Sequence, residues 1–377
     1  MTGPIVRPQT LLQAPAQWAL LVGFATLLAL PSLDWAQGID PTPPPEENRT
    51  PAPQVQVPKT LLAMAAWPAA YEAWFKDHFG LRNTLIAWHS TLMLDWFGVS
   101  PSKDVLIGKD GWLFLGATKN VDAYRCVAPY TPKELEDQRK QLVATRDWLR
   151  DRGIAYLKVW VPIKANIYPE FLPNGLTKLA QPCRMAQWFA HMAQHTDVAV
   201  LDLTGPLLAE KARNPERLYF KTDTHWNPRG AWAGYQALVP LLRKLAPKAD
   251  IIIAQRVSFH MRSETGGDLA KLLDMTERYR GSEPIQAVAN SRIQTVDNPV
   301  QRPKGIHLWT LACQGCGKAK LLMFHDSFGN HLRTFLAESF ARTVSVEFGP
   351  FDKELVQLEK PDIVIEVHLE RQMTPER

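Results

Sequence analysis

The chain has 377 residues, of which 46% are hydrophobic and 21% are charged, and its formal net charge is +5. These values exclude a disordered chain, and the length fits one large domain or two ordinary ones. The basic residues are scattered rather than clustered, so we expect no nucleic-acid partner. A mildly basic surface suits an anionic polymer.

The N-terminal segment predicts export. Residues 18–30 form an apolar run of 13 residues, preceded by an arginine and by no acidic residue. The run has the length of a signal-peptide core, and extending it to Leu33 gives 16 residues, still short for a membrane span. Cleavage after Ala36 would place Asp34 where a small residue is required. We therefore predict an uncleaved signal anchor over 1–37, with a cleaved signal peptide as the alternative.

The next segment predicts a stalk. Residues 38–58 are rich in proline, which favours an extended polyproline II conformation. Beyond it we expect one exported domain over 59–377. Its first part, 59–97, repeats apolar residues at spacings of three and four, which indicates a helical lead-in.

The rest of the chain predicts an α/β fold. Residues 104–115 indicate a hairpin, and 131–153 an amphipathic helix with Thr131 as N-cap, Glu134 completing a capping box and Gly153 at the end. Short apolar strands and helices then alternate. Strands are expected over 154–162, 198–203, 320–324, 343–348 and 362–367, and helices over 185–195, 230–245 and 330–340. This order predicts a parallel sheet flanked by helices, with the site at the carboxyl ends of the strands.

The four cysteines predict disulfide bonds, because an even number in an exported chain is typical of them. Cys126 with Cys183 would form the long-range bridge. Cys313 and Cys316, in "CQGC", would form a local disulfide or remain a pair of thiols. The connectivity stays open at this level.

Ser327 is the candidate nucleophile. It lies in "HDSFG", between an apolar strand and a helix, where backbone N–H groups have no intrahelical partner and can bind an oxyanion. The alternative is that Ser327, or equally Asp326, only caps the helix. His325 in the same turn is a further candidate for lining a pocket.

Asp223 and His225, in "YFKTDTHWNPRGA", fit three interpretations: two members of a catalytic triad, two metal ligands, or a polar loop. The sequence contains no HExxH motif and no paired Cys/His cluster, so we predict no metal. In a triad, Asp223 orients His225 and His225 takes the proton of Ser327. The order Asp, His, Ser is one of several that triads use.

Several segments together resemble the alginate O-acetyltransferase family of the AlgJ and AlgX type. They are "YEAWFKDHFGLRN", "SPSKDVLIGKDGWLFL", "VPIKANIYPE", "YFKTDTHWNPRGA", "ETGGDL" and "HDSFG". The resemblance implies an SGNH-hydrolase-like fold with Ser327 as nucleophile, His225 as base and Asp223 as orienting acid. Little sequence follows "DIVIEVHLER", so we expect the single-domain, membrane-anchored AlgJ type.

The resemblance also implies a function. We expect an exported O-acetyltransferase, anchored to the inner membrane on the periplasmic side, that acetylates an exopolysaccharide such as alginate. It implies a membrane-bound O-acyltransferase as the partner that supplies acetyl groups, and no cofactor. The alternatives are an acetylesterase with the same triad and a non-catalytic polysaccharide-binding component of a secretion complex. Candidate substrate-binding residues are Lys164, Tyr168, Trp226 and Asn330.

Overall fold

The structure is a computed structural model, and it describes residues 13–42, 50–254, 257–287, 292–298, 300 and 303–375. The chain divides into two compact units, Met1–Pro101 with Lys271–Met275, and Ser102–Ala270 with Thr276–Arg377. Parts of the predicted anchor and stalk, residues 1–12 and 43–49, lie outside the described residues.

In its described residues the first unit contains α1 (Gln13–Gln37), α2 (Leu61–His78) and α3 (Arg82–Asp95). The helix α1 is longer than the apolar run in the sequence, because it continues through Pro31 to Gln37. Pro15–Gln37 is 23 residues long and apolar enough to cross a membrane, by length and composition only. At 1.5 Å per residue it measures about 34 Å, close to the thickness of a bilayer's hydrocarbon core.

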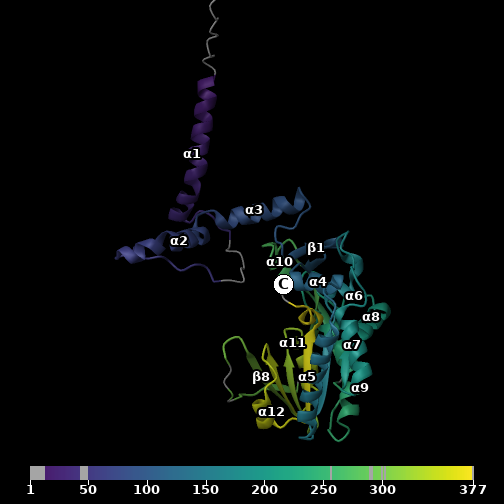
Figure 1. The fold of residues 1–377 in the computed structure, drawn as a ribbon. Coiled ribbons are helices and arrows are strands. Elements are labelled where there is room, and N and C mark those ends of the chain that lie inside the picture. Colours follow the sequence, from purple (N-terminus) through teal and green to yellow (C-terminus); the bar gives the residue numbers. More distant parts are fainter. Residues whose placement is uncertain are drawn as a thin grey trace, which may run out of the picture. The chain divides into compact units, whose positions relative to one another are not determined.

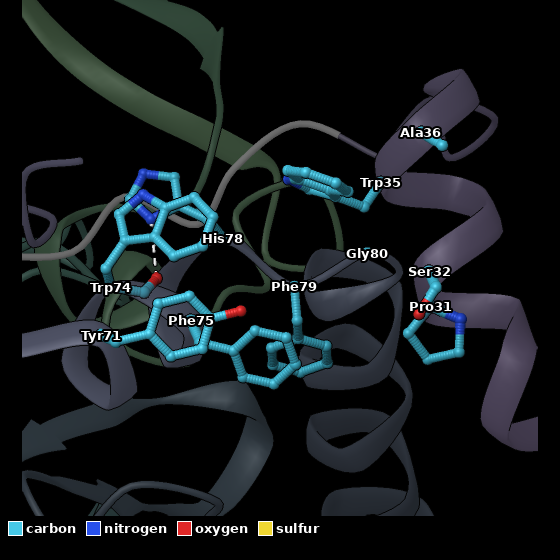
Figure 2. Close-up of a pocket in the computed structure, with 10 residues that line it drawn as sticks. All are labelled: Pro31, Ser32, Trp35, Ala36, Tyr71, Trp74, Phe75, His78, Phe79 and Gly80. Atoms are coloured by element: carbon cyan, nitrogen blue, oxygen red, sulfur yellow. Dashed lines mark hydrogen bonds between the residues drawn. The ribbon is translucent and has the colours of Figure 1, made fainter. Parts of the chain in front are cut away.

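The end of α1 lies against the junction of α2 and α3. Figure 2 shows Trp35 of α1 pointing toward the aromatic side chains at the end of α2. Between them lies a cavity of about 310 Å³. Gly80 sits so close to α1 that a Cβ there would clash with the backbone of Pro31. The junction therefore depends on a glycine at position 80.

The second unit is built on a mixed sheet. Among the described residues its strand order is β4–β3–β11–β9–β10–β8–β7. The first five of these strands are parallel, whereas β8 is antiparallel to β10 and β7 is antiparallel to β8. The predicted parallel sheet is present in five strands, and the two antiparallel strands at one edge were not predicted. The bounds are β3 (Ala155–Val161), β4 (Val200–Asp202), β7 (Ile293–Thr295), β8 (His307–Cys313), β9 (Lys320–His325), β10 (Arg342–Glu347) and β11 (Ile363–Leu369).

Helices cover both faces of this sheet, as the sequence predicts (Figure 1). One face packs on α8 (Thr204–Arg213), α9 (Pro228–Leu245) and α11 (Gly329–Ala337). The other packs on α5 (Pro132–Arg150), α7 (Arg184–His195) and α12 (Lys353–Glu359). Strand β3 shows the alternation that this requires, since Leu157 and Val159 belong to one core and Tyr156 and Trp160 to the other.

Shorter elements complete the unit. The predicted hairpin is present as β1 (Val105–Ile107) and β2 (Leu113–Leu115), and a second hairpin joins β5 (Ser258–Glu264) to β6 (Gly281–Ala287). The remaining elements are α4 (Thr118–Arg125), η1 (Lys109–Gly111), α6 (Lys164–Ile167), η2 (Pro169–Phe171), α10 (Asp268–Lys271) and η3 (Glu370–Met373).

The capping box predicted for α5 is confirmed. Thr131 Oγ1 accepts a hydrogen bond from Glu134 N at 3.2 Å, and Glu134 Oε2 accepts one from Thr131 N at 2.7 Å. Gly153, shortly after the helix, has φ +72°, a left-handed conformation that glycine adopts without a steric cost. Local sequence signals therefore set both ends of this helix.

Candidate active site

Ser327 lies in a tight turn between the central strand β9 and the helix α11. The carboxylate of Asp326 holds this turn: Oδ1 accepts from Phe328 N at 3.0 Å, and Oδ2 accepts from Leu369 N and Gln372 Nε2, both at 2.7 Å. These bonds tie the turn to the end of β11, the neighbour of β9. The residue that directly precedes α11 is Phe328, which has no side-chain cap, and the Ser327 side chain does not cap the helix, whereas Asp326 Oδ1 satisfies the Phe328 N–H just before it.

His325, the last residue of β9, packs closely against Gly329, the first residue of α11. A Cβ on Gly329 would clash with the His325 ring, so the first residue of α11 must be glycine. His325 is buried, donates from Nδ1 to Asp326 O at 2.6 Å and accepts at Nε2 from Ser345 Oγ at 2.5 Å. Burial lowers its pKa to about 4, which keeps the ring neutral. His325 is therefore a core residue and lines no pocket.

Asp223 and His225 belong to the DTH loop, residues 219–227, which lies between α8 and α9. The helix α8 separates this loop from the preceding strand β4. An antiparallel bridge between Tyr219 and Trp226 closes the loop, and Phe220 N donates to His225 O at 3.2 Å. Asn227 then caps α9 by accepting from Arg229 N at 2.9 Å.

The two segments meet at His225. Its Nδ1 lies 2.7 Å from Asp223 Oδ1, and its Nε2 lies 2.8 Å from Ser327 Oγ. With Nδ1–H donating to the carboxylate, Nε2 is free to accept from the serine hydroxyl. The imidazole thus bridges Asp223 and Ser327, as the sequence-based hypothesis requires.

Asp268 is a second carboxylate at this imidazole, and sequence reasoning missed it. Its Oδ2 lies 3.7 Å from His225 Nδ1, and its Oδ1 accepts from Thr224 N at 2.7 Å. In return, Asp268 N donates to Asp223 Oδ2 at 3.0 Å. The preceding Gly267 packs so tightly on Asp223 that a Cβ there would lie 2.8 Å from Oδ2. The segment "ETGGDL" thus places its backbone close to Asp223 and adds a second carboxylate beside His225.

The charges around His225 set its protonation. Burial lowers the pKa of His225, but the hydrogen bond and charge of Asp223, with a further contribution from Asp268, outweigh it and raise the pKa above its usual value. The pKa of Asp223 is lowered, because the contacts with His225 and backbone N–H groups outweigh burial. Burial and the neighbouring Asp223 raise the pKa of Asp268. The pair of carboxylates therefore stabilises a positive charge on the imidazole.

Lys164 supports the DTH loop from beneath. Its Nζ donates to the carbonyls of Asp223 at 2.8 Å, Phe220 at 3.2 Å and Lys221 at 3.3 Å. Burial lowers the pKa of Lys164 to about 7, although nearby carboxylates oppose this shift. The three carbonyl acceptors match the three N–H donors of a protonated ammonium group. The hydrogen bonds favour the charged form. With 4% of its surface exposed, Lys164 positions the loop and does not line a pocket.

Two other predicted substrate-binding residues are also buried. Tyr168 accepts from Leu218 N at 2.9 Å, and Trp226 donates from Nε1 to Phe328 O at 2.9 Å. A side chain enclosed in the core cannot contact a dissolved polymer, so these two predictions are wrong. Asn330 is half-buried at the start of α11, and its side-chain amide donates to Glu347 Oε1 at 2.7 Å.

The turn also contains a candidate oxyanion donor. The N–H groups of Phe328, Gly329 and Asn330 all donate to atoms of Asp326 or Ser327. Within the part of the chain that the structure describes, the backbone N–H of Ser327 has no such acceptor. It is therefore the donor in this turn that an oxyanion on the acyl carbon can use.

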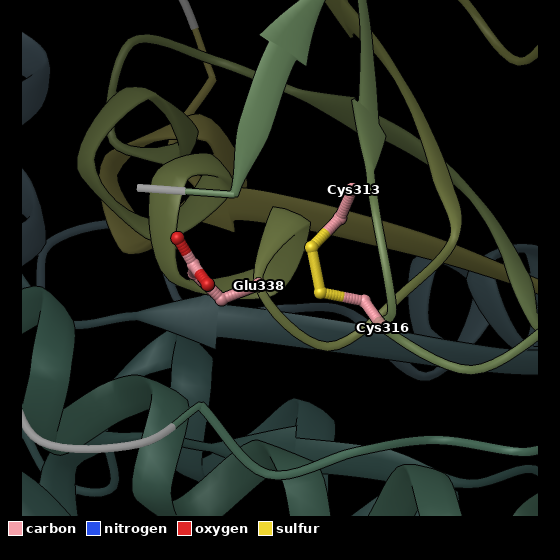
Figure 3. A group of neighbouring side chains, drawn as sticks. All are labelled: Cys313, Cys316 and Glu338. Carbon is pink, nitrogen blue, oxygen red and sulfur yellow. A yellow bond between two sulfur atoms is a disulfide. The ribbon is translucent and has the colours of Figure 1, made fainter. Parts of the chain in front are cut away.

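The cysteines form two disulfides, Cys126–Cys183 and Cys313–Cys316. Figure 3 shows the second bond beside Glu338. Cys313, Cys316 and Glu338 are close enough to hold a metal ion, but the thiolate is the form of cysteine that binds metals, and both sulfurs are in the disulfide. Asp223, His225 and Asp268 form a second such group. In that group, both ring nitrogens of His225 already have partners, Asp223 and Ser327.

Comparison with known proteins assigns the chain to a family. Residues 105–306 match the model of the SGNH hydrolase-like domain of the acetyltransferase AlgX. This segment is more than half of the chain. The chain belongs to the AlgX family of SGNH hydrolase-like domains. The match contains Asp223, His225 and Asp268 and ends before Ser327.

Individual relatives agree with this family. The chain is 26% identical over 189 residues to the probable alginate O-acetylase AlgJ of Pseudomonas syringae pv. tomato, covering 50% of this chain and 46% of that protein. It is 31% identical over 140 residues to the AlgJ of Pseudomonas aeruginosa, covering 37% and 33%. The aligned region thus spans less than half the length of these relatives.

A solved structure supports the fold. Bacillus cereus PatB1 is 17% identical and superposes with a TM-score of 0.52, covering 72% of this chain and 98% of that one. At this identity the likeness concerns the fold alone.

Proposed function

We propose that the protein is an exported O-acetyltransferase that moves an acetyl group through Ser327 to hydroxyls of an exopolysaccharide such as alginate. The observation that carries this proposal is the position of the His225 imidazole, within hydrogen-bond distance of both Asp223 Oδ1 and Ser327 Oγ. The family, an acetyltransferase by description, and the AlgJ relatives point to the acetyl group and to alginate.

In the first step, Ser327 Oγ attacks the carbonyl carbon of an acetyl donor while His225 Nε2 takes the hydroxyl proton. The negative charge moves to the carbonyl oxygen, where the N–H of Ser327 stabilises it. The tetrahedral intermediate collapses, the bond to the leaving group breaks, and the imidazolium returns the proton to that group. Asp223 stabilises the imidazolium and holds its tautomer. The product is an acetyl ester on Ser327.

In the second step, a sugar hydroxyl attacks the acetyl-serine. His225 Nε2 takes the proton of this hydroxyl, a second tetrahedral intermediate forms, and its collapse returns the proton to Ser327 Oγ. The acetyl group is now an ester on the sugar, and the enzyme is regenerated. The reaction needs no cofactor and no metal.

The donor follows from the membrane location that we propose. The candidate membrane span Pro15–Gln37 would anchor the protein on the periplasmic face of the inner membrane. A membrane-bound O-acyltransferase, the partner that the family resemblance implies, would deliver acetyl groups there.

The test uses purified protein, an activated acetyl ester and defined oligosaccharides. Acetylated sugar is the expected product, and acetate alone would favour the acetylesterase instead. A fluorophosphonate should label the wild type and not Ser327→Ala. The matched control is Ser258→Ala, which removes an exposed serine in β5 and should leave labelling unchanged. Labelling that persists in Ser327→Ala would contradict the proposal.

A further inference from the structure

An apolar stripe runs along the exposed side of α3 and continues just past its end. Leu85, Trp88, Leu92 and Trp96 follow one another at spacings of three and four, which places them on one helix face. They are exposed, Trp88 to 70% and Trp96 to 81%. We call these four residues the α3 stripe. Such a contiguous exposed patch marks a surface that another phase or molecule covers.

The neighbouring helix α2 also exposes apolar side chains. None of its residues is buried, although most of them are apolar or aromatic. Leu61 and Leu62 are each 87% exposed, and Tyr71 and Phe75 are also exposed. A helix with this composition is not stable as an isolated element in water, so α2 needs a covering surface as well.

The candidate membrane span is joined to this helix pair by specific contacts. Asp34, in the last turns of α1, accepts from Leu81 N at 2.7 Å at the start of α3. Asp40, just beyond α1, accepts from Thr84 Oγ1 at 2.8 Å. Carboxylates at a helix N-terminus are favoured by the helix dipole and by its unpaired N–H groups. Asp34 is buried there, so removal of α1 by cleavage after Ala36 would leave the start of α3 without this partner.

The arrangement of the three helices favours a bilayer surface as the surface that covers α2 and α3. Both α2 and α3 run across the end of α1 rather than alongside it (Figure 1). Figure 2 shows the contact between the helices, with Pro31 and Ser32 of α1 beside Phe79 and Gly80. If α1 spans the membrane, its attached end lies at the headgroup level, and α2 and α3 lie along that surface. Trp and Tyr rings are enriched at this level because they combine an apolar body with a polar group.

We propose that α1 is retained as a membrane anchor and that α2 and α3 lie on the phospholipid surface, with the α3 stripe facing the lipid. The inference rests on the membrane anchor of the proposed function and is independent of acetyl transfer. It assigns Asp34 as the residue that holds the surface helices to the anchor.

The test measures the surroundings of single labels in the full chain. All four native cysteines are in disulfides, so an introduced cysteine is the one free thiol. Trp88→Cys and Leu92→Cys place an environment-sensitive fluorophore on the α3 stripe, and Thr91→Cys places it on an exposed site beside the stripe. The protein is reconstituted into vesicles of phosphatidylcholine and phosphatidylglycerol with nitroxide-labelled lipid. We expect at least twofold stronger quenching by the lipid nitroxide at positions 88 and 92 than at 91, and the reverse order with aqueous iodide.

Three results would overturn the proposal. Iodide quenching at 88 and 92 equal to that at 91 would place the stripe in water. Shielding of both positions from both quenchers would indicate a protein partner or a second copy of the chain. A mature protein whose intact mass lacks α1 would remove the anchor.

Two further variants test Asp34 as the link to the anchor and the independence of surface docking from acetyl transfer. Asp34→Ala should reduce lipid quenching at Leu92→Cys by about half, and an unchanged value would exclude Asp34 as the link. Ser327→Ala should leave the quenching pattern intact, so a failure of the proposed chemistry and a failure of the surface docking give different results.

Discussion

His225 Nε2 lies 2.8 Å from Ser327 Oγ although the two residues are 102 positions apart in the chain. The DTH loop carries the imidazole, and the turn between β9 and α11 carries the hydroxyl. No local sequence signal predicts that these two segments lie next to each other. In the proposed function this contact places a base on a nucleophile, so its removal should have consequences that can be measured.

Replacing the nucleophile should abolish transfer without unfolding the protein. Ser327→Ala removes the attacking oxygen and one hydrogen bond, so we expect the acetyl-transfer rate to fall by at least about 10³-fold. The free energy of unfolding should change by only about 1 kcal/mol. Rates with an activated acetyl ester and a thermal unfolding curve test both. A variant that keeps more than a tenth of the wild-type rate would contradict the assignment.

The pH dependence should reveal the Asp223–His225 pair. His225 accepts a proton only when it is neutral, and its pKa is raised above its usual value, so activity should rise with pH through that raised pKa. Asp223→Asn removes the main group that raises it. We expect the acid limb of kcat/KM to move to lower pH and the rate to fall by up to about 10⁴-fold, the cost of this substitution in a serine protease triad. An unmoved acid limb would argue against the pairing.

Asp268 should act as a positioning residue with a smaller effect. Asp268→Asn keeps the side-chain shape and the acceptor for Thr224 N but removes a charge 3.7 Å from His225 Nδ1. We expect a loss of about tenfold in kcat/KM and an acid limb that moves to lower pH, because Asp268 contributes to the raised pKa of His225. Thermal stability should stay close to wild type. Equal losses in Asp223→Asn and Asp268→Asn would mean that both carboxylates orient the imidazole.

Lys164 should be more important for stability than for substrate binding. Lys164→Met keeps the length of the side chain but leaves three carbonyls of the DTH loop without their donor. We expect a loss of roughly 2–4 kcal/mol in the free energy of unfolding. The KM for the oligosaccharide should change little in the folded fraction. A raised KM with unchanged stability would restore the prediction that Lys164 contacts the substrate.

Removal of metal ions should leave the reaction unchanged. Both ring nitrogens of His225 are engaged by Asp223 and Ser327, so we expect the proposed triad to operate without an ion in the Asp223, His225 and Asp268 group. We expect transfer rates within about twofold of the untreated enzyme after dialysis against EDTA. A loss restored by Zn²⁺ would favour the metal-ligand interpretation of the DTH loop.

Local signals account for most of the elements. The capping box of α5 and the apolar strands β3, β9 and β11 are present where the sequence predicts them, because each depends on neighbouring residues. The antiparallel strands β7 and β8 were missed. β8 pairs with β10, which begins 29 residues after β8 ends, and β7 pairs with β8, so both depend on partners outside the segment itself. Short runs such as "HLWTLAC" carry no signal for strand direction.

At the candidate site, too, the sequence predicted some features and missed others. Residue chemistry and the family resemblance were enough to select Asp223, His225 and Ser327 as a hypothesis, because few residue types can act as acid, base and nucleophile. The sequence does not reveal burial, so it does not show that Lys164, Tyr168 and Trp226 are core residues rather than substrate contacts. Asp268 lies 45 positions from Asp223, and the close packing of Gly267 together with hydrogen bonds between the two segments brings them together.

The sequence by itself determined the apolar N-terminal segment, the α/β class and the chemical types at the candidate site, since these depend on composition and on short-range periodicity. The tertiary structure decided which imidazole nitrogen faces which partner, which polar side chains are enclosed, and where the end of α1 attaches to α3. Those properties arise from contacts between distant segments, whose free energy depends on packing and desolvation in three dimensions.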